Sequence, residues 1–379
     1  MVTNYEKIAK KMGVPWSEEM EKILKALYSL EESDILLVFN GPYLDRLDAK
    51  KIAKKLKRPI DEVDPLLKEM ARTQRLFSAS KGGETTFSMF PLLPGLFELY
   101  FSNYERAMKE EKEVLELFTA EYEKYYNQGH VVNSMSSSYP FMRVFVDEEV
   151  IKDTIERGKG TIIEVDQEVE QYKNKILHFE QVKNLVEKSR RISVMDCACR
   201  THMKLHNDGV PVNDYPINVC MSFNVFADYC IENGFGREMS KEETLKTLNE
   251  AAKAGLVHTT QNMTKKTTFI CNCDRDCCVM LRGIRQFNDP NVIATSNFIP
   301  DYERDNCILC LKCVELCPMN IIEMVDDKRI SINLNRCIGC GVCAFNCPEE
   351  ALTMIKKYDK IPVENAMSMM TKSIEGRKN

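Results

Sequence analysis

The feature that most constrains the fold is a repeat of four cysteines near the C-terminus. The segments CILCLKCVELCP and CIGCGVCAFNCP begin at Cys307 and Cys337, and both read C-x2-C-x2-C-x3-C-P. Cysteines separated by two residues lie on one tight turn, which presents their thiols and neighbouring backbone N–H groups to the same point. The proline after the fourth cysteine ends the turn. This pattern predicts that the segment folds around metal centres.

The spacing is that of the ferredoxin run for two [4Fe–4S] clusters, in which the fourth cysteine of each run reaches the other cluster. The predicted ligand sets are Cys307, Cys310, Cys313 and Cys347 for one cluster, and Cys337, Cys340, Cys343 and Cys317 for the other. Zinc ribbons also use C-x2-C, but they need neither the third cysteine nor the proline. Because cysteine ligation leaves no iron open, the expected chemistry is one-electron transfer.

Between the two runs, IIEMVDDKRISINLN alternates apolar and polar residues around an Asp-Asp-Lys turn, which predicts a hairpin. Residues 300–356 resemble bacterial-type two-cluster ferredoxins over the full length of that domain. The tail 357–379 is expected to be a docking or solvated extension.

Composition limits the classes of protein that are compatible with this chain. It has 379 residues, 44% of them apolar, and a formal net charge of −5, which gives no overall attraction to nucleic acid or anionic membrane. The start MVTNYEKIAK has no apolar signal region, and no apolar run is long enough to span a bilayer, so we expect a cytoplasmic protein. Sixteen cysteines in a reducing compartment favour metal ligation over disulfides.

The remaining eight cysteines lie between positions 197 and 278. In RISVMDCACR and TTFICNC, extended chains would place each C-x-C pair on one strand face, so two strands could bring four thiols together. The candidate metal ligands are Cys197, Cys199, Cys220, Cys271, Cys273, Cys277 and Cys278. One additional cluster or metal ion, a metal-free thiol pocket and a reversible disulfide all remain open.

Other polar residues border these cysteines. Ser240 and Glu243 predict a helix start and Gly255 a helix stop. His258, which follows, could face the thiol site or be a hydrogen-bonded structural residue. His202 and His206 are expected to be a solvated pair.

CACR, GLVHTTQN and FICNCDRDCC, followed by the two-cluster repeat, resemble the multi-cysteine 4Fe-4S dicluster ferredoxin-type proteins of anaerobic bacteria and archaea. The resemblance covers residues 164–350 and implies electron transfer in anaerobic metabolism. The last motif of that family reads closer to CNCCxCCC, so Asp274 and Asp276 stand where cysteines are expected, and Asn213 replaces another. Carboxylates match a sulfide cluster poorly, so we expect at most one extra site.

Residues 16–90 read as three helices followed by a Gly-containing hairpin, the order of a winged helix. Lysines on and after the second helix would suit DNA, but the third helix begins with Asp61, Glu62 and Asp64, which repel it. Contact with a protein is therefore the favoured role, and nucleic acid is not expected as a partner.

The sequence thus predicts an α+β multidomain protein. Its expected parts are a winged-helix-like domain (1–95), a helical linker (96–190), a Cys-rich α/β middle domain (191–299), a two-[4Fe–4S] ferredoxin domain (300–356) and the tail (357–379). The leading hypothesis is an iron–sulfur electron-transfer protein or oxidoreductase subunit with a partner redox protein. The alternatives are a redox-responsive transcriptional regulator that uses the winged helix, and an oxidoreductase whose substrate binds at the middle-domain cysteines.

Metal analysis tests this interpretation. Anaerobically purified protein should be brown and contain about eight iron atoms and as many acid-labile sulfides per chain, or about twelve of each with one extra cubane. Zinc without inorganic sulfide would contradict it.

Overall fold

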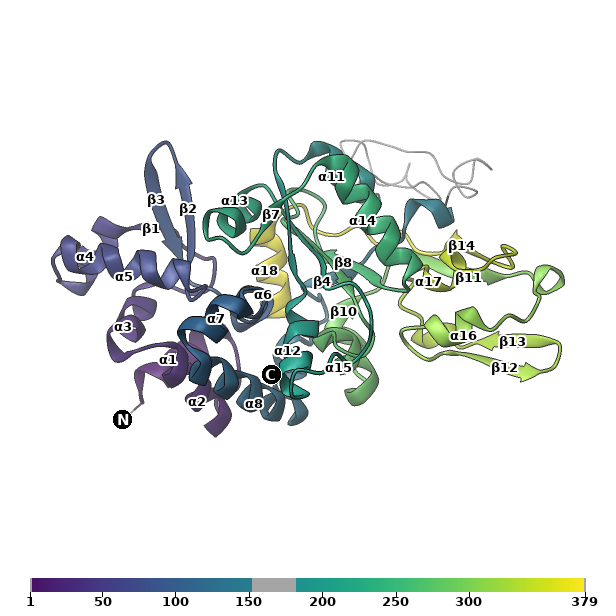
Figure 1. The fold of residues 1–379 in the computed structure, drawn as a ribbon, viewed down its shortest axis with the longest axis horizontal. Helices are drawn as coiled ribbons and strands as arrows, with labels where there is room; N and C mark the ends of the chain where they lie inside the picture. Colours follow the sequence, from purple (N-terminus) through teal and green to yellow (C-terminus); the bar gives the residue numbers. More distant parts are fainter. Residues whose placement is uncertain (1, 152–181, 378–379) are drawn as a thin grey trace. The chain divides into compact units, whose positions relative to one another are not determined.

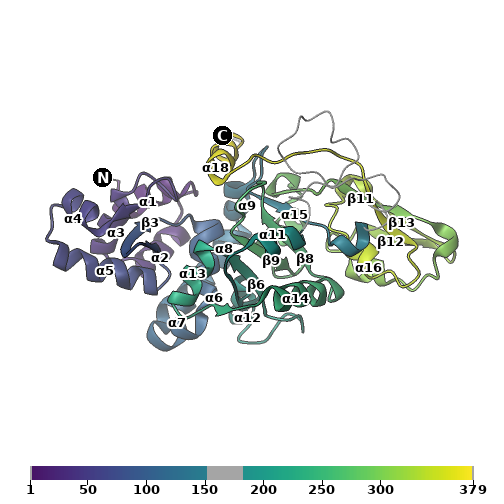
Figure 2. The ribbon, with the colours of Figure 1, turned by 90° about the horizontal axis from the view of Figure 1, so that it is seen from above.

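The computed structural model describes residues 2–151 and 182–377. These residues form two compact units, the first comprising Met1–Met135, Met195–Asn218 and Val225–Arg237, and the second Ser136–Val194, Val219–Asn224 and Glu238–Asn379. Figures 1 and 2 show the chain in two views. Part of the predicted helical linker, 152–181, lies outside the described residues.

The first unit opens with helices and a hairpin. Its elements are α1 (Asn4–Met12), α2 (Glu18–Leu27), α3 (Leu30–Val38), β1 (Leu47–Asp48), α4 (Ala49–Leu56), α5 (Ile60–Arg72), β2 (Phe77–Lys81) and β3 (Glu84–Ser88). The predicted hairpin is confirmed as β2–β3. The predicted first helix ends at Leu27 because Ser29 begins the next one with a capping box, in which its side chain and Glu32 satisfy each other's backbone N–H groups.

The rest of the first unit is mostly helical. Its elements are η1 (Leu92–Leu96), α6 (Phe97–Ser102), α7 (Tyr104–Glu110), α8 (Lys112–Asn127), α9 (His130–Met135), α12 (Ala198–His206) and α13 (Val225–Glu232). His202 is 1% exposed, packs against Phe97, Phe101 and Tyr122, and lies 3.2 Å from the Thr119 carbonyl oxygen through Nε2. The expectation of a solvated histidine pair is therefore wrong for His202, because α12 turns this side chain into an aromatic core.

The second unit contains a mixed sheet whose described strands have the order β10-β4-β8-β9-β6-β5-β7. The strands are β4 (Met142–Val144), β5 (Ile192–Asp196), β6 (Asn218–Phe223), β7 (Arg237–Glu238), β8 (Val257–Gln261), β9 (Phe269–Cys273) and β10 (Ile293–Ala294). The associated helices are η2 (Glu148–Ile151), α11 (Val182–Lys188), α14 (Lys241–Lys253), α15 (Val279–Phe287) and η5 (Pro290–Val292). In both views α14 and α15 lie on opposite sides of β8.

The two faces of this sheet differ in chemistry. Ile270, Met221 and Val194 point to one face and form an apolar core with Val186 of α11 and Leu248 of α14. Strand residues alternate, so Cys271 and Cys273 on β9 point to the opposite face, which α15 approaches. The strand predicted for TTFICNC is thus confirmed.

The strand predicted through CACR is wrong. Strand β5 ends at Asp196, Cys197 occupies the N-cap position of α12, and Cys199 lies in the helix. The Cys197 carbonyl oxygen accepts the backbone N–H of Thr201 at 2.9 Å, which commits the chain to a helix at this point. Cys197 and Cys199 therefore do not alternate along a strand.

The C-terminal part of the second unit is built from two antiparallel strand pairs, β11 (Phe298–Tyr302) with β14 (Leu352–Lys356), and β12 (Ile322–Asp326) with β13 (Arg329–Ile332). The second pair confirms the predicted hairpin. Short helices accompany each cysteine turn: η6 (Arg304–Asn306), α16 (Lys312–Leu316), η7 (Leu334–Arg336) and α17 (Val342–Phe345). The tail carries α18 (Ala366–Glu375), which is docked through Ser137 Oγ, a donor to the Ser373 carbonyl oxygen at 2.8 Å.

None of the helices described in 2–151 and 182–377 is both long and apolar enough to cross a membrane.

At the start of α5, Arg58 forms ion pairs with Glu31 and Glu62, and Lys68 pairs with Asp64 at 2.6 Å. Two of the three acids predicted at the start of this helix, Glu62 and Asp64, are therefore paired with local cations.

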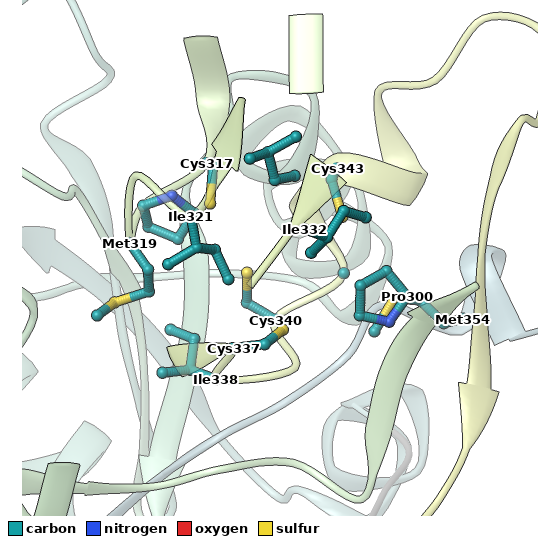
Figure 3. A pocket seen from close by; sticks show the side chains of 13 residues that line it. Pro300, Cys317, Met319, Ile321, Ile332, Cys337, Ile338, Cys340, Cys343 and Met354 are labelled. Atoms are coloured by element: carbon teal, nitrogen blue, oxygen red, sulfur yellow. The ribbon is translucent and has the colours of Figure 1, made fainter. Parts of the chain in front are cut away.

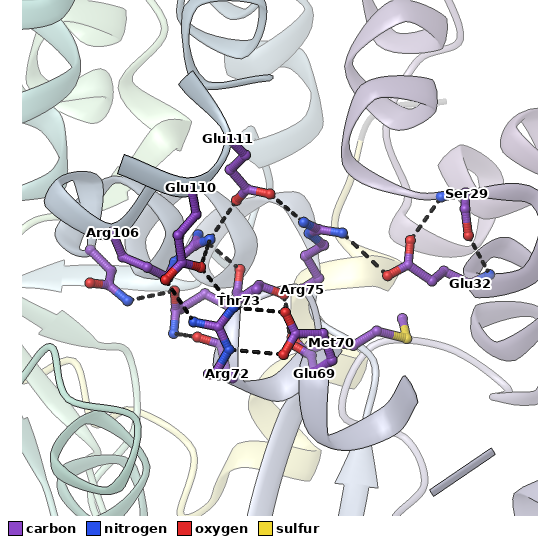
Figure 4. Close-up of polar contacts among 12 residues, drawn as sticks. Ser29, Glu32, Glu69, Met70, Arg72, Thr73, Arg75, Arg106, Glu110 and Glu111 are labelled. Atoms are coloured by element: carbon purple, nitrogen blue, oxygen red, sulfur yellow. Dashed lines mark hydrogen bonds and ion pairs between the residues drawn. The ribbon is translucent and has the colours of Figure 1, made fainter. Parts of the chain in front are cut away.

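An ion-pair network ties the first unit together (Figure 4). Arg75, which follows α5, contacts Glu32 of α3 at 3.2 Å and Glu111 at the start of α8. Arg106 of α7 contacts the other oxygen of Glu111 at 2.7 Å. The side chains of Arg75 and Glu111 are only 15% and 12% exposed, so loss of one partner would leave a buried charge uncompensated.

We predict that Arg75→Met destabilises the first unit by about 3 kcal/mol, because Glu32 and Glu111 lose their shared cation. Arg72→Met is the matched control, since Arg72 also bridges two glutamates but its side chain is 44% exposed, and it should cost less than about 1 kcal/mol. Hydrogen exchange of residues 2–135 measures both. Equal effects of the two substitutions would contradict a dominant role for burial.

Candidate iron–sulfur sites

Cysteines from both repeats surround a small cavity in the C-terminal domain (Figure 3). Three come from the second repeat and one from the end of the first. Apolar side chains such as Ile321, Ile338 and Met354 complete the lining. The cysteines are Cys317, Cys337, Cys340 and Cys343.

A second small cavity has the reciprocal composition. It is lined by three cysteines of the first repeat and the last cysteine of the second, together with Tyr302, Ile330 and Leu352. The cysteines are Cys307, Cys310, Cys313 and Cys347. The grouping in the two cavities is the one that the spacing predicts, with the fourth cysteine of each run crossing to the other cavity.

The two turns share a backbone conformation although their sequences differ. Gly339 and Gly341 have φ of +68° and +78°, and Leu309 and Leu311, their counterparts in the first repeat, have +57° and +61°. In this left-handed region successive N–H groups turn inward, and the Gly339 N–H lies 3.4 Å from Cys337 Sγ. Leu309 and Leu311 adopt this conformation at a steric cost that glycine avoids.

Burial makes these thiols poor acids by themselves. Desolvation raises the pKa of Cys313 to about 11 and the pKa values of Cys337, Cys340 and Cys343 above the ordinary thiol value. Nearby backbone N–H groups of Val314, Val342 and Ala344 act in the opposite direction on Cys313, Cys340 and Cys343. A bound cationic centre would remove the penalty, because metal coordination deprotonates a thiol outright.

The donor sets fit [4Fe–4S] groups. Each cavity offers four sulfur ligands, inward backbone N–H groups and an apolar wall, which are the elements with which proteins hold such clusters. Within residues 2–151 and 182–377, no three His, Cys, Asp or Glu side chains converge tightly enough to hold a single metal ion.

The middle-domain cysteines fall in both units. Cys197, Cys199 and Cys230 belong to the first, and the others to the second. In the second unit the Cys271 thiol is hydrogen-bonded with Cys220 and Cys273, and these contacts, followed by burial, raise the pKa of Cys271 well above the ordinary value. Cys273 is in turn hydrogen-bonded with Cys278, and Thr259 Oγ1 lies 3.2 Å from its sulfur.

Asp274 and Asp276 have structural partners. Asp274 is 1% exposed and accepts the backbone N–H of Asp276 at 2.8 Å, which closes the turn. Asp276 pairs with Arg275 at 3.3 Å and with Arg285 at 3.1 Å. These carboxylates shape the turn that carries the cysteines.

His258 also has a structural partner, because its Nδ1 lies 2.5 Å from Asn272 Oδ1, on the sheet face opposite Cys271. Arg275 is not among the site residues predicted from the sequence. Its Nη1 donates to the carbonyl oxygens of Glu315 at 2.6 Å and Cys317 at 3.5 Å. Its position between Asp274 and Asp276 was the feature of the sequence that could have indicated a role in this turn.

Comparison with known proteins identifies the C-terminal domain. Residues 306–351 match the family described as 4Fe-4S dicluster domain. The ferredoxin of Methanothermococcus thermolithotrophicus is 35% identical over 54 residues, which cover 14% of this chain and 90% of that ferredoxin. This protein belongs to the family of 4Fe-4S ferredoxin-type proteins. The membership rests on the ferredoxin-type domain, which the family model matches over residues 306–351.

Larger redox systems contain similar segments. Pyruvate synthase subunit PorD of Methanothermobacter marburgensis is 40% identical over 57 residues, 15% of this chain and 65% of PorD. The delta subunit of the NADH-dependent phenylglyoxylate dehydrogenase of Aromatoleum evansii is 38% identical over 50 residues, 13% of this chain and 53% of that subunit. The ferredoxin-type protein thus spans less than two thirds of either relative.

We predict that Gly339→Ala lowers the iron content by about four atoms per chain. An added Cβ would lie 2.3 Å from both the Phe298 carbonyl oxygen and Ser296 Oγ, so the turn that carries Cys337 and Cys340 must shift. Gly209→Ala is the control, because Gly209 also has a positive φ, +84°, but nothing lies within 4 Å of its added Cβ. Full iron content in Gly339→Ala, measured anaerobically, would contradict the assignment of this turn.

Proposed function

We propose that this protein is an iron–sulfur electron-transfer protein, or the electron-transfer subunit of an oxidoreductase, in the cytoplasm of an organism with anaerobic metabolism. The eight ferredoxin-domain cysteines would hold two [4Fe–4S] clusters. The observation that carries the proposal is the reciprocal grouping of four cysteines around each of two cavities. Bound clusters of this type supply one-electron chemistry.

The protein's own residues supply the surroundings that tune such centres. Apolar side chains line the cavity that contains Cys317, which is itself 5% exposed. The other set of cysteines reaches the surface at Cys310, which is exposed, and its neighbour Ile308 is 61% exposed. We therefore assign the Cys310 side as the surface through which a partner redox protein exchanges electrons.

The N-terminal residues 1–95 would be a winged-helix-like domain that contacts protein. The acidic start of α5, where Glu62 and Asp64 are paired with Arg58 and Lys68, supports a protein surface over a phosphate-binding one. The relatives from pyruvate synthase and phenylglyoxylate dehydrogenase are both named as subunits, which favours a subunit role for this protein as well. The remaining expected parts are those predicted above, 96–190, 191–299, 300–356 and 357–379.

Ligand substitution tests the proposal. Cys310→Ser and Cys340→Ser should each lose about four iron atoms, and each should remove a different set of EPR signals from dithionite-reduced protein, because the two cysteines line different cavities. Reduction of the unsubstituted protein should consume one electron for each cluster.

Cys230→Ser is the matched control, since Cys230 is fully buried in α13 and lies outside the ferredoxin-type domain. It should retain iron, signals and reducibility. If Cys310→Ser and Cys340→Ser removed the same signals, or if the protein held zinc without sulfide, the two-cluster assignment would be wrong.

A further inference from the structure

A row of contacting thiols lies on the sheet face opposite the apolar core of the second unit. Strands β6 and β9 are antiparallel, with Met221 opposite Ile270 and Ser222 opposite Phe269. Continuing this register by one residue places Cys220 directly opposite Cys271. Residues paired in this way project to the same face, and the two thiols are hydrogen-bonded.

The turn after β9 adds the last member of the row. Asp274 accepts two backbone N–H groups, from Asp276 through its side chain at 2.8 Å and from Cys278 through its carbonyl oxygen at 3.0 Å. The chain therefore folds back, and Cys278 occupies the N-cap position of α15. Its thiol is hydrogen-bonded with Cys273, which shares the strand face of Cys271.

We propose that Cys220, Cys271, Cys273 and Cys278 ligate a third iron–sulfur cluster in the second unit. Four thiols from two adjacent strands and a helix start are gathered on one face, and the chemistry of an all-thiol set selects a soft metal centre. Thr259 borders the row and offers a hydroxyl group to Cys273 at 3.2 Å. Such hydrogen bonds to ligand sulfur are a means by which proteins adjust cluster potentials.

The position of this set favours an iron–sulfur cluster over zinc. Arg275, between Cys273 and Cys278, donates to the carbonyl oxygens of Glu315 and Cys317 and lies 3.4 Å from Asn320 Oδ1. Cys317 lines one of the two ferredoxin cavities. A zinc ion has no redox chemistry, so only a redox-active centre makes use of this adjacency; this step rests on the proposed electron-transfer function.

Other contacts hold the ferredoxin-type domain against the same sheet. Asn346 Nδ2 donates to the Ala252 carbonyl oxygen at the end of α14 at 3.1 Å. Ser296 Oγ donates to the Gly339 carbonyl oxygen at 2.6 Å. The thiol row and the Cys317 cavity are therefore parts of one packed unit.

Iron and acid-labile sulfide per chain test the proposal in anaerobically purified full-length protein. The unsubstituted protein should contain about twelve of each, and Cys271→Ala/Cys273→Ala about eight, with the ferredoxin EPR signals retained. Cys220→Ala, on a different strand, should also lose about four iron atoms, which separates a ligand effect from local misfolding of β9. Cys230→Ala and Cys277→Ala replace buried cysteines outside the set and should retain about twelve.

The outcomes separate this proposal from the function proposed above. About eight iron atoms in the unsubstituted protein, whether with one zinc ion or with four thiols that react with an alkylating agent, would overturn the third cluster and leave the two ferredoxin clusters standing. Loss of iron from Cys277→Ala but not from Cys220→Ala would overturn the proposed ligand set. Absence of iron and sulfide from every preparation would overturn both proposals.

Discussion

The C-terminal domain depends on the burial of thiols that have no charge partner of their own. Eight cysteines line two cavities, and desolvation raises the pKa of most of the deeply placed ones. Buried apolar side chains of this short segment, such as Ile321, Ile338 and Leu352, line the same cavities. The cavities and the turns around them therefore define the domain, and the crossing of Cys317 and Cys347 links its two halves into one structure.

The same domain is attached to the mixed sheet of the second unit by hydrogen bonds between side chains and backbone carbonyl oxygens. Ser296 binds the Gly339 carbonyl oxygen inside the cysteine turn, and Arg275 binds the carbonyl oxygens beside Cys317. These contacts involve the loops that carry the cysteines rather than peripheral surface. A conformational change in the sheet would therefore displace the cysteine turns. Through these contacts the middle of the chain is physically connected to the cysteine loops of the ferredoxin-type domain.

The first unit is held together differently, by aromatic packing and buried ion pairs. Aromatic side chains, including His202 in a structural role, fill its helical core, and the buried ion pairs of Arg75, Arg106 and Glu111 join segments that are distant in sequence. Buried ion pairs contribute little net stability but disfavour alternative packings when no other partner is within reach. This unit is a defined helical scaffold in which one helix, α5, has an acidic start.

The sequence by itself determined the chemistry of the ferredoxin-type domain, because its cysteine spacing, prolines and hairpin are local features that fix the turns directly. It also indicated the α5 acids, the β2–β3 hairpin and the strand that contains Cys271. It failed at CACR, where hydrogen bonding to the first turn of α12 overrides a β-prone composition, and at His202, whose burial depends on helices far away in the chain. Only the tertiary structure paired Cys220 with Cys271, brought Cys278 to Cys273 and placed Arg275 against Cys317. Strand register and turn closure join residues across tens of positions, and no local pattern encodes which of several cysteines will meet.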